Sequence, residues 1–280
     1  MSLRPPGLHD DVPEAEYHAD RASLSVTGAK LLLKSPAKFR YRLDHPEHKD
    51  VFDFGSAAHR MVLGVGADLV VHEYDANAVK SPKSTKAWKE QQASVRAEGG
   101  VLLLPEEHQT VTAMADALSG HSTATRLLSR GRPEVSAYAL DEPTGVMRRG
   151  RFDWLNDDML VDYKTAVSAT RRDFASSAAK FAYDMQAAWY LDLARDNDLE
   201  PRGFVFIVQE KEPPYEVACI QLDPDAVNAA RNLNAHALER FRDCTEAGIW
   251  PGHTPDRVVS ADLPSWRWND YHFATLQESA

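Results

Sequence analysis

Two aspartates and a lysine stand close together in GRFDWLNDDMLVDYKTA, the stretch that runs from Gly150 to Ala166. Asp153 and Asp162 are nine positions apart, and Lys164 follows two positions after Asp162. Carboxylates hold hard cations such as Mg²⁺ together with substrate phosphates. A neighbouring ammonium can orient an attacking water or neutralise charge that develops on a phosphate. These residue types therefore suit metal-assisted hydrolysis of a phosphodiester.

The geometry of strands decides whether the three groups meet. Residues i and i+2 of a strand point to the same face, so Asp162 and Lys164 are expected to project together. A short turn at residues 156–158 would bring Asp153, on the preceding antiparallel strand, level with Asp162. The alternative is a set of ordinary surface charges on a hairpin. Asp162, however, follows an apolar run in surroundings that read as buried, where a charge is costly unless it is paired or ligated.

Hydrophobic periodicity predicts the elements that position these residues. Alternating patterns predict strands over residues 134–141, 146–156 and 159–166, followed later by strands over 203–211 and 215–223. Helices are expected over 23–36, where Ser25 or Thr27 can cap the start, and over 55–64, 81–100, 105–121, 122–131 and 224–248. Residues 170–197 are expected to form a short helix followed by a long one. This order of elements predicts a mixed α/β or α+β fold with a central sheet. We expect one domain over residues 23–252, after an extended N-terminal segment (1–22) and before a Trp-rich tail (253–280).

Composition narrows the class of protein. The chain has 280 residues, of which 43% are hydrophobic and 26% charged, and no apolar run approaches the roughly 20 residues of a membrane span. The N-terminus has no apolar signal region, and the two cysteines, Cys219 and Cys244, fit a reducing cytoplasm. The formal net charge of −10 argues against a generic nucleic-acid binder, because phosphate contacts need Lys and Arg.

Local basic clusters oppose this net charge. They are more often solvated faces than binding sites, but one of them immediately precedes Asp153. The residues that we expect to contact DNA, if any do, are Lys30, Lys34, Lys38, Arg40, Lys83, Lys86, Arg149 and Arg151. The Trp-rich tail could pack on the core, reach a neighbouring subunit or stack on bases, and core packing is the simplest expectation.

The order His59, Asp153, Asp162-x-Lys164 and Gln186-x-x-x-Tyr190 resembles the PD-(D/E)XK nuclease superfamily in its RecB-like branch. The segments YHADRASLSVTGAKLLLKSPAKFRYRLDHPE and FDFGSAAHRMVL resemble, more closely, the RecE-like (exonuclease VIII) nuclease family of phages and prophages. The resemblance runs from about Tyr17 to Tyr190. Each motif alone is a weak signal, and the resemblance rests on the motifs occurring in the same order as in the family. One departure is Phe152, which stands where the named pattern has a proline before the acid.

The resemblance implies a role for each matching residue. It makes Asp153, Asp162, Lys164, Gln186 and Tyr190 the catalytic set, the last two as residues that support the site and contact DNA. It makes His59, Asp153, Asp162 and the backbone carbonyl of Tyr163 the ligands of one or two Mg²⁺ or Mn²⁺ ions. Glu134 is a further candidate ligand. The family fold is a central mixed sheet flanked by helices.

The resemblance also implies an activity and partners. The expected activity is 5′→3′ digestion of one strand at double-stranded DNA ends, which leaves a 3′ overhang for recombination. The expected assembly is a ring-shaped homo-oligomer around the DNA. The expected partner is a single-strand annealing (RecT-like) protein, and no membrane is involved. Other readings stay open. The chain could be a single-strand exonuclease or a structure-specific endonuclease of the same superfamily, or a catalytically silent DNA-binding protein. No nucleophile elbow, Gly-rich phosphate loop or HExxH motif points to another class of hydrolase.

Overall fold

A computed structural model describes residues 4–45, 51–254 and 257–268. Its strands are β1 (Gly7–His9), β2 (Leu24–Ser25), β3 (Leu69–Val71), β4 (Val101–Leu103), β5 (Arg132–Asp141), β6 (Val146–Leu155), β7 (Met159–Ala166), β8 (Gly203–Glu210) and β9 (Val217–Ile220). Its helices are α1 (Glu14–Ala19), α2 (Val26–Lys34), α3 (Pro36–Asp44), α4 (Val51–Leu63), the short 3-10 helix η1 (Pro82–Ser84), α5 (Lys86–Ala97), α6 (Pro105–Ser119), α7 (Ser122–Leu128), α8 (Arg171–Phe181), α9 (Tyr183–Arg195) and α10 (Pro224–Ala247). None of the described helices has the length and apolarity needed to cross a bilayer.

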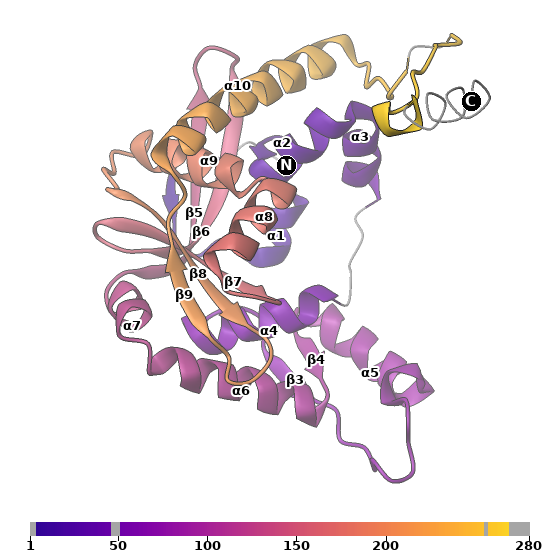
Figure 1. Ribbon diagram of the computed structural model, residues 1–280, viewed down its shortest axis with the longest axis vertical. Coiled ribbons are helices and arrows are strands. Elements are labelled where there is room, and N and C mark those ends of the chain that lie inside the picture. Colours follow the sequence, from indigo (N-terminus) through magenta and orange to yellow (C-terminus); the bar gives the residue numbers. More distant parts are fainter. Residues whose placement is uncertain (1–3, 46–50, 255–256, 269–280) are drawn as a thin grey trace, which may run out of the picture.

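Within the described chain, seven strands form one central sheet, in the order β1-β5-β6-β7-β8-β9 with β2 added beside β6. The strands β5, β6 and β7 form the antiparallel meander expected from the sequence. The strands β7 and β8 run parallel because α8 and α9 connect them, and β9 returns antiparallel to β8. The prediction of a mixed sheet flanked by helices is confirmed (Figure 1).

The hairpin between β6 and β7 pairs over a short distance only. Its backbone ladder comprises Leu155 with Leu160 and Trp154 with Val161. The next step of this register would place Asp153 opposite Asp162. The turn is anchored at Asn156, whose side-chain amide donates to the carbonyl of Leu127 at 2.7 Å. The sequence prediction that a short turn brings the two aspartates level therefore agrees with the register.

The two faces of the sheet are covered by different helices. One face carries residues such as Leu160 and Phe206 and packs against α2, α8, α9 and α10. The other face carries Val161, Tyr163 and Ile207 and packs against α4, α6 and α7. Successive residues of β7 thus serve both cores, which is why this strand reads as a continuous apolar run before Asp162.

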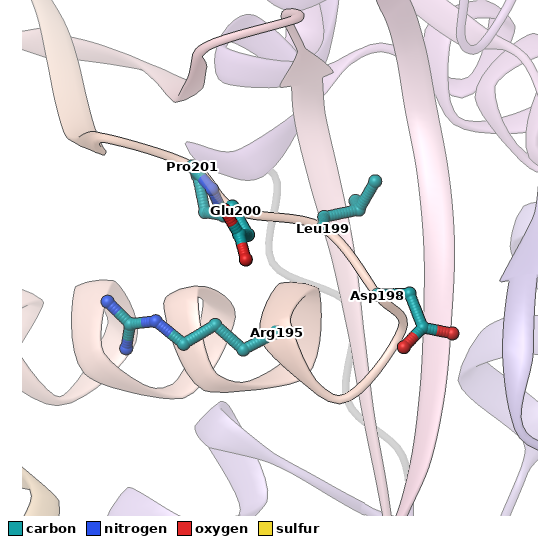
Figure 2. A pocket seen from close by; sticks show the side chains of 5 residues that line it. All are labelled: Arg195, Asp198, Leu199, Glu200 and Pro201. Atoms are coloured by element: carbon teal, nitrogen blue, oxygen red, sulfur yellow. The ribbon is translucent and has the colours of Figure 1, made fainter.

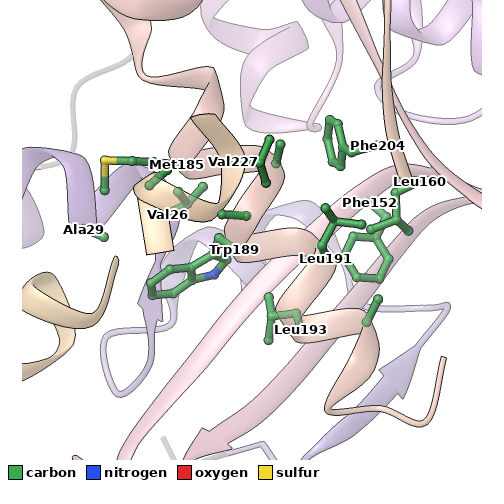
Figure 3. Packing of buried hydrophobic residues seen from close by; sticks show 14 of the residues in the cluster. Val26, Ala29, Phe152, Leu160, Met185, Trp189, Leu191, Leu193, Phe204 and Val227 are labelled. Carbon is green, nitrogen blue, oxygen red and sulfur yellow. The ribbon is translucent and has the colours of Figure 1, made fainter. Parts of the chain in front are cut away.

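Helix α9 is seated firmly on the sheet. The ring of Trp189 is 1% exposed at the centre of the larger core, and its indole N–H donates to the carbonyl of Arg149 at 3.0 Å (Figure 3). Gln186 lies three positions earlier, close to the same face of the helix. The packing of Trp189 therefore fixes where Gln186 meets the sheet.

The N-terminal segment is more ordered than the sequence suggests. Residues 1–22 were expected to be extended, but within the described part β1 pairs with β5 and residues 14–19 form α1. The side chain of Tyr17 is buried beneath Arg149 and Arg151, whose guanidinium carbons lie 5.2 and 4.4 Å from its ring centroid. Periodicity over so short a segment does not reveal contacts with strands more than 100 residues away.

Three further differences from the expected elements are local. Pro36 ends α2 as expected, and Ser35 then caps a second helix, α3, through the N–H of Lys38. The strands β3 and β4 form a small parallel pair that the sequence patterns did not predict. In the tail, Trp266 and Trp268 are 65% and 50% exposed, so the expectation of core packing is wrong for these two residues, while residues 269–280 lie outside the described chain.

Candidate active site

Asp162 is the buried centre of the candidate site. It is 1% exposed, and one oxygen, Oδ2, lies 2.6 Å from the ammonium of Lys164. The other oxygen, Oδ1, accepts a 2.5 Å hydrogen bond from the side-chain amide of Gln186. Strand β7 therefore presents Asp162 and Lys164 on one face, as predicted, and α9 supplies Gln186 from above that face.

The pKa values of Asp162 and Lys164 indicate an excess of negative charge around them. Burial, together with the nearby Asp153 carboxylate, raises the pKa of Asp162 to about 6, although Lys164 opposes the shift. Burial alone would lower the pKa of Lys164, but the carboxylates of Asp162 and Asp153 outweigh it and raise that pKa above its ordinary value. The cluster thus favours the lysine as an ammonium and would be stabilised by further positive charge.

Asp153 lies where the β6–β7 ladder stops. Its Oδ2 accepts the backbone N–H of Tyr163 at 2.9 Å, so a side chain rather than a backbone carbonyl satisfies this donor. The register of this ladder, continued by one step, brings Asp153 level with Asp162.

His59 reaches the same place from α4. Its Nε2 lies 2.8 Å from the backbone carbonyl oxygen of Tyr163, and its Nδ1 lies 3.7 Å from Oδ2 of Asp153. The imidazole also packs edge-on against the Tyr163 ring, with centroids 5.2 Å apart. His59 and the Tyr163 carbonyl, which the family resemblance assigned as metal ligands, are thus in direct contact although they are 104 residues apart in the chain.

Glu134 completes the acidic side. It lies opposite Asp153, because Pro133 pairs with Trp154 and Val135 with Phe152. Its φ of +53° is unusual for a residue with a side chain. Like charges directly opposite on two strands are destabilising. Burial, and next the charge of Asp153, raise the pKa of Glu134 to about 8. Strain and repulsion at one point are features that functional sites retain.

These groups fit a divalent cation. Among the described residues, ligand atoms of His59, Glu134 and Asp153 all lie within 4.8 Å of one another. The Nε2 of His59 and the Tyr163 oxygen are 2.8 Å apart, the distance of an ordinary hydrogen bond, so both lie close enough together to border one ion. Oδ2 of Asp162 is buried, and its one close charged neighbour among the described residues is the ammonium of Lys164 at 2.6 Å. An oxygen-rich set with raised carboxyl pKa values and one histidine suits Mg²⁺ or Mn²⁺.

The grouping differs in one respect from the predicted ligand set. The compact group contains Glu134, which was the least supported candidate, and leaves out Asp162. Asp162 is instead committed to Lys164 and Gln186. Its part in binding an ion stays a prediction.

Tyr190 lies beneath the site rather than in it. Its ring packs edge-on against Phe152 at 5.5 Å and in a tilted arrangement against Phe204 at 6.0 Å. Burial raises its pKa well above the ordinary value. A Cβ added at Gly150 would lie 2.9 Å from the Tyr190 ring, so this glycine is needed for the close approach. The geometry supports a packing role for Tyr190, and its direct contact with DNA stays a prediction.

The basic candidates fall into two groups. Arg149 is 7% exposed and donates to Oγ of Ser23 at 2.9 Å, while Arg151 donates to the carbonyl of Val12 at 2.7 Å. Both hold the N-terminal segment against β6, and this argues against the DNA contacts predicted for them. A sequence cannot distinguish a buried arginine from a surface one when the partner lies more than 100 residues away.

The other basic candidates are exposed, apart from Lys30, which is half-buried. Arg40 pairs with Asp44 at 3.0 Å, Lys83 with Glu107 at 2.5 Å and Lys86 with Glu90 at 3.5 Å. No ion pair joins Lys34 or Lys38 to another described residue. The first basic cluster, on α2 and α3, therefore carries more uncompensated charge than the second, on η1 and α5.

Tyr183, the first residue of α9, belongs to the site but was not singled out in the sequence. The ammonium groups of Lys164 and Lys30 lie 5.5 and 5.9 Å from its ring centroid. Its position three residues before Gln186 was the available signal, because i and i+3 neighbour each other on a helix.

A hollow in the surface of the described chain lies elsewhere. It has a volume of about 510 Å³ and is lined by Arg195, Asp198, Leu199, Glu200 and Pro201 (Figure 2). Arg195 ends α9, nine residues from Gln186, which is roughly 13 Å along a helix. This surface hollow brings together none of the groups described above.

Comparison with solved structures agrees with this fold. The chain superposes on the crystal structure of a "Putative exonuclease" from Eubacterium rectale with a TM-score of 0.59, at 16% sequence identity, over 92% of this chain and 98% of that one. No curated protein matches the chain in sequence. The fold and the Asp-…-Asp-x-Lys arrangement together define the class of PD-(D/E)XK-type domains.

The family follows from the sequence match. The model of the PDDEXK-like domain of unknown function (DUF3799) matches residues 25–256. The chain belongs to this family. The match includes His59, Glu134, both aspartates, Lys164 and Gln186, so these candidate site residues lie inside the family domain.

Proposed function

We propose that this protein is a divalent-metal-dependent DNA exonuclease that degrades one strand of linear duplex DNA, in the 5′→3′ direction, and leaves a 3′ single-stranded overhang. One observation carries the proposal: the buried Asp162 carboxylate is held between Lys164 and Gln186, directly beside Asp153 and His59. A PDDEXK-like family membership and an exonuclease-like fold support the same class of reaction.

The residues divide the work between binding and positioning. His59, Glu134 and Asp153, with the Tyr163 carbonyl and Asp162, would hold the cation. A divalent ion at this place supplies Lewis-acid activation of the phosphate and of the attacking water. Lys164 brings a charged donor to the reacting phosphate, and Asp162 keeps it in place at 2.6 Å. Gln186 fixes the rotation of the Asp162 carboxylate.

The partners follow from the same proposal. The substrate is a double-stranded DNA end, the protein assembles as a ring-shaped homo-oligomer around it, and a single-strand annealing (RecT-like) protein takes over the overhang in the cytoplasm. Lys34 and Lys38 are exposed and form no ion pair with another described residue, which supports a DNA-facing role for α2 and α3. A ring would place such surfaces inward and leave the acidic remainder, which gives the net charge of −10, outside.

The test is a nuclease assay on linear duplex labelled separately at the 5′ and the 3′ end, beside a covalently closed circle. Each substrate is incubated with Mg²⁺, with Mn²⁺ and with chelator. The 5′ label should be released first as short products, the 3′-labelled strand of the same end should survive, and the circle should stay intact. Asp162→Asn should abolish release. Asp157→Asn, which removes an exposed carboxylate from the turn of the same hairpin, should not.

Other outcomes separate the alternatives. Cutting of the circle would indicate an endonuclease, and digestion of single strands alone would indicate a single-strand exonuclease. Binding to DNA without any cleavage, whichever divalent metal is present, would contradict the proposal and favour a silent binding protein.

A further inference from the structure

Two lysines from different elements share one aromatic ring beside Asp162. Lys164 comes from β7 and Lys30 from α2, and both ammonium groups lie over the ring of Tyr183, at 5.5 and 5.9 Å from its centroid. Helix α2 packs against α9, which carries Tyr183. The site therefore contains a second cation that the motif of two acids and a lysine does not include.

The two lysines differ in their partners. Lys164 is paired with Asp162 at 2.6 Å. Among the described residues, the side chain of Lys30 makes neither an ion pair nor a hydrogen bond, and its contact with the Tyr183 ring is a cation–π contact. A half-buried cation without an anionic partner is costly, so its presence calls for an explanation.

The pKa of Lys30 shows that its positive charge is not fully neutralised by neighbouring anions. Burial, and next the positive charge of Lys164, lower its pKa to about 8, while Asp162 and Asp184 oppose this shift. Asp162 is already taken up by Lys164 and Gln186. An additional anion close to Lys30 would remove the destabilisation.

A phosphodiester is the anion that the site must accept. Three carboxylates, those of Glu134, Asp153 and Asp162, lie close together and would repel a phosphate. Lys164 pairs with Asp162 at 2.6 Å and Arg151 lies 3.9 Å from Glu134, so these two cations offset only part of the negative charge. A lysine ammonium binds phosphate as a point charge with three donors, and all three of these donors are uncommitted in Lys30.

We propose that Lys30 binds the phosphodiester that is to be cleaved, as a second cationic contact beside Lys164. This inference rests on the proposed nuclease function and adds to it a substrate-binding residue from α2. Tyr183 holds both lysines and so sets their separation, which makes it a positioning residue.

The test compares Lys30→Met with Lys30→Arg, which keeps the charge, and with Arg202→Met. Arg202 is an exposed cation just before β8, at the end of the sheet opposite Lys164, so its replacement removes one positive charge away from the site. Affinity for a labelled linear duplex is measured by fluorescence anisotropy in chelator, where no cleavage occurs, over a series of salt concentrations. Melting temperature and kcat/KM with Mg²⁺ are measured in parallel.

Lys30→Met should weaken kcat/KM roughly tenfold or more, the effect of losing one charged hydrogen bond. Its plot of log affinity against log salt should lose about 0.9 in slope, because one phosphate contact is gone. Its melting temperature should be unchanged or higher, because an unpaired buried cation is removed. Lys30→Arg should restore most of the slope, and Arg202→Met should match wild type in all three measurements.

Two results would overturn the inference separately from the proposed function. If the wild-type protein cleaves DNA and Lys30→Met has the same salt slope as wild type, Lys30 contacts no phosphate. A lower melting temperature without any change in slope would mean that Lys30 serves packing against Tyr183 only. A wild-type protein that cleaves no DNA would overturn the proposed function and this inference together.

Discussion

The side-chain amide of Gln186 lies 2.5 Å from Oδ1 of Asp162, and the contact joins helix α9 to strand β7 inside the protein. Both side chains are buried. The hydrogen bond leaves Oδ2 of Asp162 for Lys164 and for a cation. A neutral amide that only donates here therefore decides the orientation of the most buried charge in the site.

Gln186→Ala should reduce both stability and activity. It leaves a buried carboxylate oxygen without its donor, which costs about 1–3 kcal/mol of unfolding free energy. Because the Asp162 carboxylate can then rotate away from Lys164, kcat should fall well below wild type. Urea denaturation and nucleotide release measure the two effects.

A matched control is another buried glutamine on the opposite face of the sheet. Gln209 accepts from the Tyr163 hydroxyl at 2.7 Å and donates to the carbonyl of Met114 at 2.7 Å. Gln209→Ala should lose stability on the same scale but keep kcat near wild type. Equal losses of activity in the two variants would contradict an orienting role for Gln186.

Glu134 should make the metal-free protein less stable at higher pH. Its native pKa of about 8 exceeds the value of about 4.3 in an unfolded chain, so the native state binds more protons between these limits. Stability from this group is complete below pH 4.3 and is lost as the pH rises through 8. Glu134→Gln cannot ionise, so in chelator its melting temperature should exceed that of wild type at pH 8.5 and approach it at pH 5.

The control for this pH effect is Glu142→Gln, in the exposed turn between β5 and β6. It should follow the wild-type curve throughout. A parallel decline of wild type and Glu134→Gln with pH would rule out Glu134 as the origin of the effect.

Mn²⁺ should stabilise the native protein through the cluster of His59, Glu134 and Asp153. An ion at a hundred times its dissociation constant adds about 2.7 kcal/mol to the unfolding free energy, because it binds only the native state. His59→Ala and Asp153→Asn should lose most of the resulting rise in melting temperature, and Asp157→Asn should keep it. Calorimetric scans with and without the ion give the comparison, and an undiminished rise in Asp153→Asn would place the ion elsewhere.

Gly150→Ala should destabilise the protein beneath the site. An added Cβ would lie 2.8 Å from Leu193 and 2.9 Å from Tyr190, and both belong to the packed layer under β6. Overpacking of this kind typically costs about 1–3 kcal/mol. Denaturant titration measures the loss.

Gly55→Ala is the matched control for this glycine, because it lies inside α4 with no atom within 4 Å of an added Cβ. It should stabilise the protein by about 0.5–1 kcal/mol, since alanine is the better helix former. A loss of stability at Gly55 as large as at Gly150 would show that the close contacts are not the cause.

Local patterns predicted the parts of the fold that local physics determines. Period-two alternation located β5, β6 and β7, and the i, i+2 rule placed Asp162 and Lys164 on one face. The short turn at residues 156–158 made the meeting with Asp153 predictable. Gln186 was placed on a helix face, but its contact with Asp162 depends on how α9 is seated by Trp189, which no local pattern encodes.

The rest depends on contacts between distant segments. Arg149 and Arg151 read as a basic cluster before Asp153, yet Tyr17, Ser23 and Val12 bury or bind them. Lys30 read as one charge in a run, and only the approach of α2 to Tyr183 distinguishes it from Lys34. Glu134 was the weakest candidate ligand because its left-handed backbone and its position opposite Asp153 appear only in three dimensions.

The length of the turn at residues 156–158 also determines the register between β6 and β7, and therefore which face of the sheet each side chain of β7 occupies. Leu160 and Val161 are both apolar and face different cores, so packing alone would tolerate these two side chains exchanging sides. Inserting or deleting one residue in this turn would move Asp162 toward the layer of α6 and bring Tyr163 beneath α9. Inserting or deleting one residue here could thus produce a related protein that keeps the fold and loses the arrangement of Asp162 and Lys164. The number of residues between Asp153 and Asp162 would identify such a protein from its sequence alone.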